Sequence, residues 1–161
     1  MIGSDIVRVR PDFRVIDNPY DPGRHILVVP AINPEIGLLH GLRADPDGNM
    51  VTSAAIDANH IAQASRRVVA TVEEIRADAL DALSADEIVI PSIYLDAIAP
   101  APYGVHPLAC PGRYERDRGH LREYIAAGRD DESFAAYLRR YVFEPGGHDG
   151  YLAQIGAAVA S

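Results

Sequence analysis

The chain has 161 residues, of which 48% are hydrophobic and 24% are charged. This composition is typical of a soluble globular protein and excludes a disordered tail, a collagen-like fibre and a coiled coil. The 15 basic and 23 acidic residues give a formal charge of −8, which argues against nucleic acid or an anionic membrane as a partner. The length fits one domain over residues 1–161.

Cysteine content and the N-terminal residues indicate the cellular compartment. A single cysteine, Cys110, cannot form an intramolecular disulfide, so the fold does not depend on oxidation. Residues 1–5 lack the basic and apolar regions of a signal peptide. No apolar run approaches the roughly 20 residues that a membrane-spanning helix needs. We therefore expect a cytoplasmic protein.

Short apolar runs predict the strands. Residues 26–30 and 36–40 do not alternate with polar residues, so each run predicts a strand buried on both faces, as in a parallel sheet. Residues 68–72 are rich in β-branched side chains and predict a third buried strand. Residues 88–90 form a further apolar run, and residues 93–98 continue it beyond a proline.

Helical periodicity dominates the last third of the chain. One short apolar face over residues 121–125 ends at Gly128, in the manner of a helix C-cap. Apolar residues recur at helical spacing over residues 134–142 and 151–159. An earlier helix is predicted to begin after Asp57, which serves as its N-cap.

This order of elements predicts an α/β fold, with a mostly parallel sheet, flanking helices and a helical C-terminal third. A parallel sheet of about four strands without an opening βα unit leaves apolar surface and strand edges uncovered. We therefore expect another segment to cover them.

Several common catalytic and metal-binding motifs are missing from the sequence. It contains no glycine-rich phosphate loop, no G-x-S-x-G nucleophile elbow and no zinc-finger spacing. Cys110, with His106 four residues before it, makes a weak metal pair. Cys110 is predicted to be a small buried residue rather than a nucleophile, and no metal is expected.

Glu73 and Glu74 directly follow the strand predicted over residues 68–72. The carboxyl end of a parallel strand is where α/β proteins place ligand sites, and carboxylates there can act as acid, base, nucleophile or orienting group. The alternative is a helix start, where acidic side chains interact favourably with the helix dipole. The residues alone favour the helix start.

A proline-rich loop over residues 100–111 carries Tyr103, Gly104 and His106. Gly104 would let a ligand approach the backbone closely, and His106 could hydrogen-bond a phosphate or a carbonyl. A loop histidine held by a neighbouring carbonyl is the open alternative. Basic residues over 113–122 could meet nucleotide phosphates, but interleaved acidic residues favour a solvated helix start.

Three ordered motifs run through the chain. The first is PEIGLLHGLRAD over residues 34–45, and the second is RRVVATVEEI over residues 66–75. The third and strongest covers residues 91–114 and includes APYGVHP and CPGRY. Together they resemble the later part of the alpha subunit of class I coenzyme A transferases, the glutaconate and 3-oxoacid type.

The resemblance implies a subunit of an enzyme that moves coenzyme A between an acyl-CoA and a carboxylic acid. In this family the beta subunit carries the glutamate that attacks the thioester and forms a glutamyl–CoA thioester, so this chain would be active only with such a partner. Family alpha subunits are considerably longer, and their N-terminal segment with its glycine-rich loop has no counterpart here. The resemblance therefore also implies a separate N-terminal alpha-type segment as a partner of a split or truncated chain.

By the same resemblance, five residues would shape the acyl and coenzyme A pocket at the subunit interface; they are Glu73, Glu74, Tyr103, Gly104 and His106. Two alternatives stay open. One is a subunit of a related acyl-CoA hydrolase that opens a ring or a thioester with water. The other is a noncatalytic partner that stabilises or regulates such an enzyme.

Overall fold

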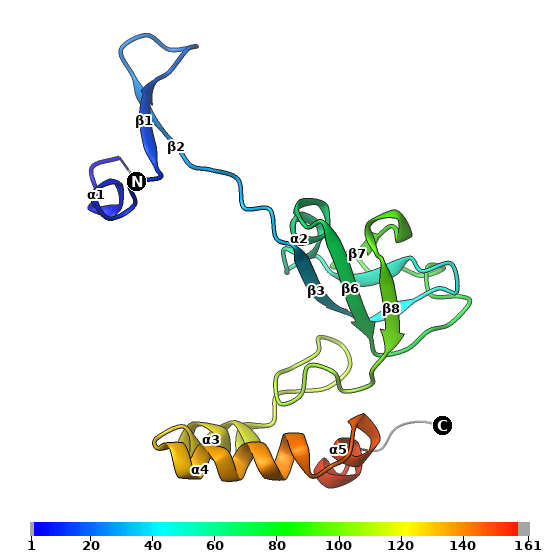
Figure 1. Cartoon of the computed structure of the whole chain (residues 1–161). Coiled ribbons are helices and arrows are strands. Elements are labelled where there is room, and N and C mark those ends of the chain that lie inside the picture. The colour runs from blue at the N-terminus through cyan, green and yellow to red at the C-terminus, as the bar shows by residue number, and fades with distance from the viewer. Residues whose placement is uncertain (1, 158–161) are drawn as a thin grey trace. The chain divides into compact units, whose positions relative to one another are not determined.

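A computed structural model describes residues 2–157, and these residues form two compact units, divided between Pro34 and Glu35 (Figure 1). None of the helices in this described part is long and apolar enough to cross a membrane.

The first unit contains a short helix, α1 (Ile6–Val9), and an antiparallel hairpin of β1 (Arg14–Asp17) and β2 (His25–Val28). The apolar run at residues 26–30 was expected to be a buried strand of a parallel sheet, and this prediction is wrong. Val28 is 42% exposed, and among the strands of the described residues β2 pairs with β1 alone. Two strands provide no second layer within the unit to bury their side chains.

The parallel sheet of the second unit has the strand order β3 (Ile36–Gly41), β6 (Arg67–Val72) and β8 (Ala97–Pro100) (Figure 1). Buried and exposed residues alternate along β3 and β6, since successive side chains point to opposite faces. Leu39 is buried, whereas Leu38 is 75% exposed. Within the described residues of the second unit the sheet is thus covered on one face only, and not on both faces as predicted. The apolar side chains exposed on the outer face are Ile36, Leu38 and Val69.

The inner face packs on α2 (Ala58–Ala64) and on an antiparallel sheet of β4 (Arg43–Ala44), β5 (Met50–Ser53) and β7 (Glu87–Ile90). The predicted strand at residues 88–90 is therefore present but lies in a second, antiparallel sheet. The helix after Asp57 is also present, although the Asp57 side chain makes no capping hydrogen bond. The buried core cluster comprises Leu39, Ala44, Met50, Ala58, Ala62, Val68, Ala70, Val72 and Ile90.

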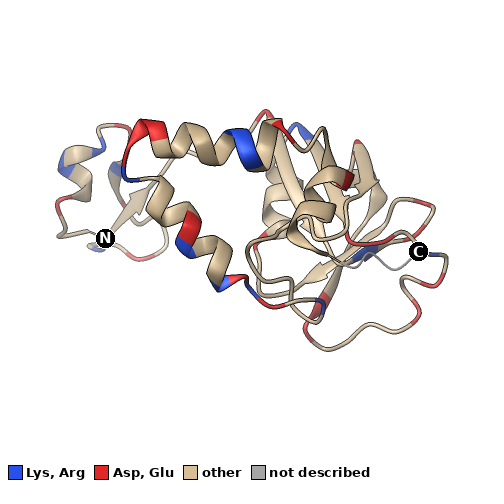
Figure 2. Cartoon of the chain, turned by 90° about the horizontal axis from the view of Figure 1, so that it is seen from below, with Lys and Arg blue, Asp and Glu red and all other residues tan. Residues whose placement is uncertain are grey.

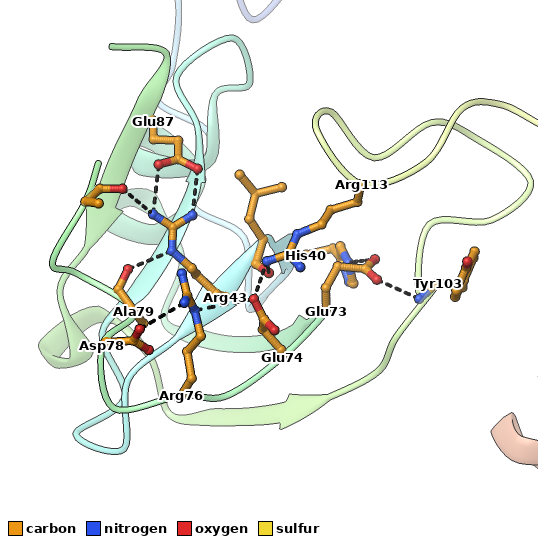
Figure 3. Close-up of polar contacts among 12 residues, drawn as sticks. His40, Arg43, Glu73, Glu74, Arg76, Asp78, Ala79, Glu87, Tyr103 and Arg113 are labelled. Atoms are coloured by element: carbon orange, nitrogen blue, oxygen red, sulfur yellow. Dashed lines mark hydrogen bonds and ion pairs between the residues drawn. The ribbon is translucent and has the colours of Figure 1, made fainter. Parts of the chain in front are cut away.

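A buried ion pair joins β4 and β7, the two edge strands of the antiparallel sheet. The Arg43 guanidinium donates to both carboxylate oxygens of Glu87, at 2.6 and 2.9 Å, and to the backbone carbonyls of Ala79 and Ala82 (Figure 3). The Arg43 side chain is 6% exposed and that of Glu87 is 12% exposed. Hydrogen bonds from Arg43 lower the pKa of Glu87 to about 2, so this carboxylate stays charged far into the acid range.

The last third is helical, as predicted. Helix α3 (Arg118–Ala127) has Asp117 as its N-cap, whose carboxylate accepts the N–H of His120, and Gly128 as its C-cap. The chain bears out the α/β class with a parallel sheet and a helical C-terminal region.

Two further helices follow. Helix α4 (Asp131–Leu138) continues into a π-helical turn, η2 (Arg139–Phe143), and α5 (His148–Ile155) comes last. Acidic residues lie at the start of α4 and arginines follow its end, an order that suits the helix dipole (Figure 2). A short 3-10 turn, η1 (Ser92–Tyr94), precedes β8. Val159, expected on the last helical face, lies outside the described residues.

Candidate active site

The Glu73 carboxylate organises a buried polar cluster at the carboxyl end of β6. Its Oε1 accepts a hydrogen bond from the Tyr114 hydroxyl at 2.7 Å and lies 2.8 Å from His40 Nε2. Its Oε2 accepts the backbone N–H of Tyr103 at 2.7 Å (Figure 3). The Glu73 side chain is 7% exposed. No helix begins at residues 73–76, so the helix start that the residues alone favoured is wrong.

The loop residues on this carboxylate are held in a constrained geometry. Tyr103 has a φ of +58°, a left-handed backbone conformation that is unusual for a bulky residue. Its ring stacks on that of Tyr114, with centroids 4.6 Å apart. The hydrogen bond to Glu73 and this stacking together hold Tyr103 in place.

Gly104 packs directly against the imidazole of His40. A Cβ atom at position 104 would lie 2.6 Å from His40 Cε1 and 2.8 Å from the carbonyl oxygen of Ala101. His40 Nδ1 lies 2.8 Å from Thr71 Oγ1, so both ring nitrogens have partners. The close approach expected at Gly104 is thus made in this structure by His40.

Cys110 and Tyr114 lie beside Glu73, and their environment disfavours ionisation of both. Burial, followed by the charge of Glu73, raises the pKa of the Cys110 thiol to about 11. Burial and the hydrogen bond to Glu73 raise the pKa of Tyr114 as well. Cys110 is 3% exposed, as predicted, and a thiol in this environment is a poor nucleophile.

A small apolar cavity adjoins the cluster. It measures about 120 Å³, and its walls include His40, Val105 and Cys110. This volume is below the roughly 300 to 1,000 Å³ of pockets that enclose drug-sized ligands, so the cavity suits a small group and not a whole coenzyme.

Glu74 lies apart from Glu73, although the two are adjacent in sequence. Its carboxylate pairs with Arg113 and with Arg76, and its side chain is 39% exposed (Figure 3). Arg113 also donates to the backbone carbonyl of Leu42. Glu74 therefore ties the loop that carries Arg113 to the sheet.

His106 belongs to a different cluster, formed with the C-terminal helices. Its Nδ1 lies 2.7 Å from the Tyr151 hydroxyl, and its Nε2 lies 3.4 Å from a carboxylate oxygen of Asp117. The His120 ring lies edge-on to it, with centroids 5.1 Å apart. Burial, followed by the nearby His106, lowers the pKa of His120. A hydroxyl and a carboxylate hold His106, in place of the neighbouring carbonyl considered above.

Of the five predicted residues, the structure brings together Glu73, Tyr103 and Gly104. Glu74 and His106 face other groups. Sequence reasoning missed His40 and Tyr114, which are 33 and 41 positions from Glu73. The signal that could have identified His40 is its position near the carboxyl end of a parallel strand, where ligand sites gather. There it is paired in register with Thr71 of the neighbouring strand.

The geometry can be compared with known proteins. A family model described as coenzyme A transferase matches residues 1–101 of this chain. The chain belongs to this family. The A-type subunit of glutaconate CoA-transferase from Acidaminococcus fermentans is 34% identical over 146 residues, covering 90% of this chain and 46% of the relative. The A-type subunit of 3-oxoadipate CoA-transferase from Pseudomonas knackmussii is 33% identical over 143 residues, covering 87% and 49%.

Solved structures of this family and its neighbours have the same fold. The crystal structure of glutaconate coenzyme A-transferase from Acidaminococcus fermentans aligns with a TM-score of 0.81 and 32% identity, over 91% of this chain and 46% of that one. The decarboxylase AibA/AibB aligns with a TM-score of 0.68 and 30% identity, over 86% and 51%. This member of the coenzyme A transferase family spans about half the length of the relatives it matches.

Proposed function

We propose that this chain is the alpha-type part of a heteromeric coenzyme A transferase, which moves coenzyme A from an acyl-CoA to a carboxylic acid. The observation that carries the proposal is the similarity to the A-type subunits of two CoA-transferases over 90% and 87% of this chain. The structural match to glutaconate coenzyme A-transferase supports it.

The nucleophile of the proposed reaction is a glutamate of a beta-type partner subunit. Its carboxylate attacks the thioester carbonyl and expels the coenzyme A thiolate, and the thiolate then attacks the glutamyl carbonyl of the resulting anhydride. This releases the donor acid and leaves a glutamyl–CoA thioester, from which the acceptor acid takes coenzyme A by the reverse steps. Glu73 is unsuited to this role, because its side chain is 7% exposed and already bonded to three groups.

The chain's own contribution is to shape the acyl part of the site. Glu73 holds the backbone of Tyr103, and Gly104 packs on His40 beside the cavity of about 120 Å³. We assign this cavity to the acyl group. Coenzyme A itself would lie against the surface that includes Glu74, and His106 would support the loop from the other side.

The uncovered face of the parallel sheet supports the partner proposal. Leu38 is 75% exposed and Ile36 is 60% exposed on the outer face. Water-exposed apolar side chains on a central sheet favour cover by another chain segment. We assign this face to the alpha-type segment that carries the glycine-rich loop in the family.

Two other functions are distinguishable from transfer. The similarity to the decarboxylase AibA/AibB favours, as a second candidate, part of a decarboxylase. A chain that admits water to the thioester would instead belong to a hydrolase. Loss of CO₂ from a carboxylated acyl-CoA would identify the first, and acceptor-independent release of free coenzyme A would identify the second.

Co-expression with the adjacent genes tests the proposal. Light scattering should find a stable heteromer, and the heteromer should transfer coenzyme A from an acyl-CoA to an added carboxylic acid. Borohydride should trap the thioester on the partner but not on this chain. Two results would contradict the proposal. One is coenzyme A transfer by the isolated chain, and the other is a folded monomer that does not bind the products of the adjacent genes. A heteromer whose activity survives changes at Glu73 and His40 would point to a noncatalytic partner.

A further inference from the structure

The cluster around His106 contains the donor set of a transition-metal site. One ligand atom each from His106, Asp117 and His120 lies within 4.8 Å of the other two. The three residues come from two segments, since His106 lies in the proline-rich loop, whereas Asp117 is the N-cap of α3 and His120 lies in the first turn of that helix. We propose that His106, Asp117 and His120 bind a divalent transition-metal ion of the Zn²⁺ class.

The spacing of the donors suits this ion. Ligand atoms bonded at about 2.0 to 2.2 Å around a tetrahedral metal lie roughly 3.3 to 3.6 Å from one another. His106 Nε2 and the Asp117 carboxylate oxygen are already 3.4 Å apart. That distance is long for a hydrogen bond but fits two ligands of one metal. The ligand atom of His120 lies within 4.8 Å of these two atoms, so it would have to approach them by about 1.5 Å at most.

Each proposed ligand is oriented by a hydrogen bond on its other polar atom. Tyr151 Oη lies 2.7 Å from His106 Nδ1, and Tyr137 Oη lies 2.6 Å from His120 Nε2. These contacts allow Nδ1–H and Nε2–H to donate to the tyrosine oxygens, which leaves His106 Nε2 and His120 Nδ1 as lone-pair donors. The second carboxylate oxygen of Asp117 accepts the backbone N–H of His120. Metal-binding histidines are typically oriented by such outer partners.

The site is also accessible from solvent. The Asp117 side chain is 46% exposed, and His106 lines an open cavity of about 450 Å³ whose walls include Tyr137 and Tyr151. Three protein ligands, of which His106 lines this cavity and Asp117 is partly exposed, leave room for water at the remaining coordination positions. Two imidazoles and one carboxylate suit Zn²⁺ and its neighbours better than Mg²⁺ or Ca²⁺, which prefer oxygen ligands.

A second group of metal-ligand residue types, His40, Glu73 and Cys110, is less suited to a metal. These atoms also lie within 4.8 Å of one another. However, the oxygens of Glu73 are already bonded to protein partners, and both nitrogens of His40 are engaged. The Cys110 thiol is protonated at neutral pH, whereas a metal binds the thiolate. This contrast assigns the ion to the His106 cluster.

Titration of the tag-free, chelator-treated full chain with Co²⁺ tests the site, because Co²⁺ replaces Zn²⁺ and reports its ligands by visible absorption. We expect one Co²⁺ per chain, displaced by Zn²⁺. Three variants should each weaken binding by more than about 100-fold, beyond the 10- to 100-fold typical of outer-partner changes. They are His106→Asn, Asp117→Asn and His120→Gln. Tyr151→Phe should fall within the 10- to 100-fold range.

The variants are chosen to keep the local structure. Asn at position 117 still accepts the N–H that caps α3. Asn at position 106 and Gln at position 120 keep an amide near the atoms that face Tyr151 and Tyr137. Circular dichroism of each variant checks folding, and Asp117→Asn alone suffices if a histidine variant fails to fold.

Two controls separate this site from others. His60, which is exposed beside Asp57, should be replaceable by Gln without loss of Co²⁺ binding. Cys110→Ser should also leave binding intact. Absence of Co²⁺ absorption at millimolar metal, survival of binding in Asp117→Asn, or its loss in Cys110→Ser would overturn the proposal. The Co²⁺ titration measures metal binding directly and needs no enzymatic activity. Its result is therefore independent of the transferase assay.

Discussion

Glu73 is the residue on which the candidate site depends most directly. Glu73→Gln replaces one acceptor oxygen by an NH₂ group, which then faces the donors of Tyr103 or of Tyr114. We expect the free energy of unfolding to fall by about 1 to 3 kcal/mol, the cost of an unsatisfied buried group. Urea denaturation measures this change. The matched control is Glu115→Gln at an exposed position outside the cluster, where a change within about 0.5 kcal/mol is expected. Equal effects at both positions would contradict the assigned role.

Gly104 is a second residue whose identity the structure explains. Gly104→Ala places a methyl group within 2.6 Å of His40 and 2.8 Å of the backbone oxygen of Ala101. The backbone cannot give way cheaply, so we expect a loss of about 1 to 3 kcal/mol in stability, seen as a lower Tm. Gly128→Ala is the control, because nothing lies closer than 3.6 Å to a Cβ there. A Tm unchanged by the first substitution would show that His40 moves freely.

The candidate site illustrates what a sequence can reveal about single residues. Glu73 was predictable because it directly follows a β-branched strand, and Gly104 because it lies in a proline-rich loop. His40 carries no such local signal, since its partners Thr71 and Glu73 are more than 30 positions away. Its role depends on the pairing of β3 with β6, which a single sequence does not specify.

Arg43 and Glu87 connect strands β4 and β7, and their ion pair should make this sheet sensitive to acid. The pKa of Glu87 falls from 4.5 to about 2 on folding, so its contribution is fully present above pH 4.5. The contribution is lost as the pH falls from about 4.5 to about 2. The shift corresponds to a loss on the order of 3 kcal/mol.

Glu87→Gln isolates this contribution from that of the other carboxylates. The difference in unfolding free energy between the unsubstituted chain and the variant should be largest near neutral pH and should shrink toward pH 2. Chemical denaturation at a series of pH values measures it. A difference that does not vary with pH would show that folding does not lower the pKa of this carboxylate.

The positions of strands and helices along the chain were easier to predict than the sheet in which each strand lies and the strand with which it pairs. Apolar runs correctly indicated β3, β6 and β7, and periodicity indicated α3, with Gly128 at its end. The run at residues 88–90 looks the same in an antiparallel as in a parallel sheet, so its sheet could not be inferred. The run at residues 26–30 was misjudged because apolar character does not reveal whether a second layer is available to bury it.

The outer face of the parallel sheet gives a prediction for the whole assembly. Leu38→Ser changes a side chain that is 75% exposed, so the stability of the isolated chain should change by less than about 0.5 kcal/mol. The same change should weaken assembly with the co-expressed partners by at least tenfold, because the side chain is buried there. Light scattering or sedimentation of the complex measures this effect.

Ile93 provides the control for that experiment. It is 85% exposed in the turn η1, which is not one of the strands of the parallel sheet. Ile93→Ser should leave assembly unchanged. If both variants assemble normally, the outer face is not the contact surface. If both fail, the loss reflects general apolar exposure and not this face.

The buried position of Cys110 has a practical consequence for the intact molecule. Its thiol is 3% exposed, and at a pKa of about 11 only about one part in a thousand is thiolate at pH 8. A disulfide reagent should therefore modify it mainly when the loop around residues 103–114 swings open. Because the sequence has one cysteine, the labelling rate measures how often this loop opens, and no cysteine has to be introduced by mutation. An acyl group or a partner chain seated on the loop would register as slower labelling, in a measurement that needs neither catalysis nor unfolding.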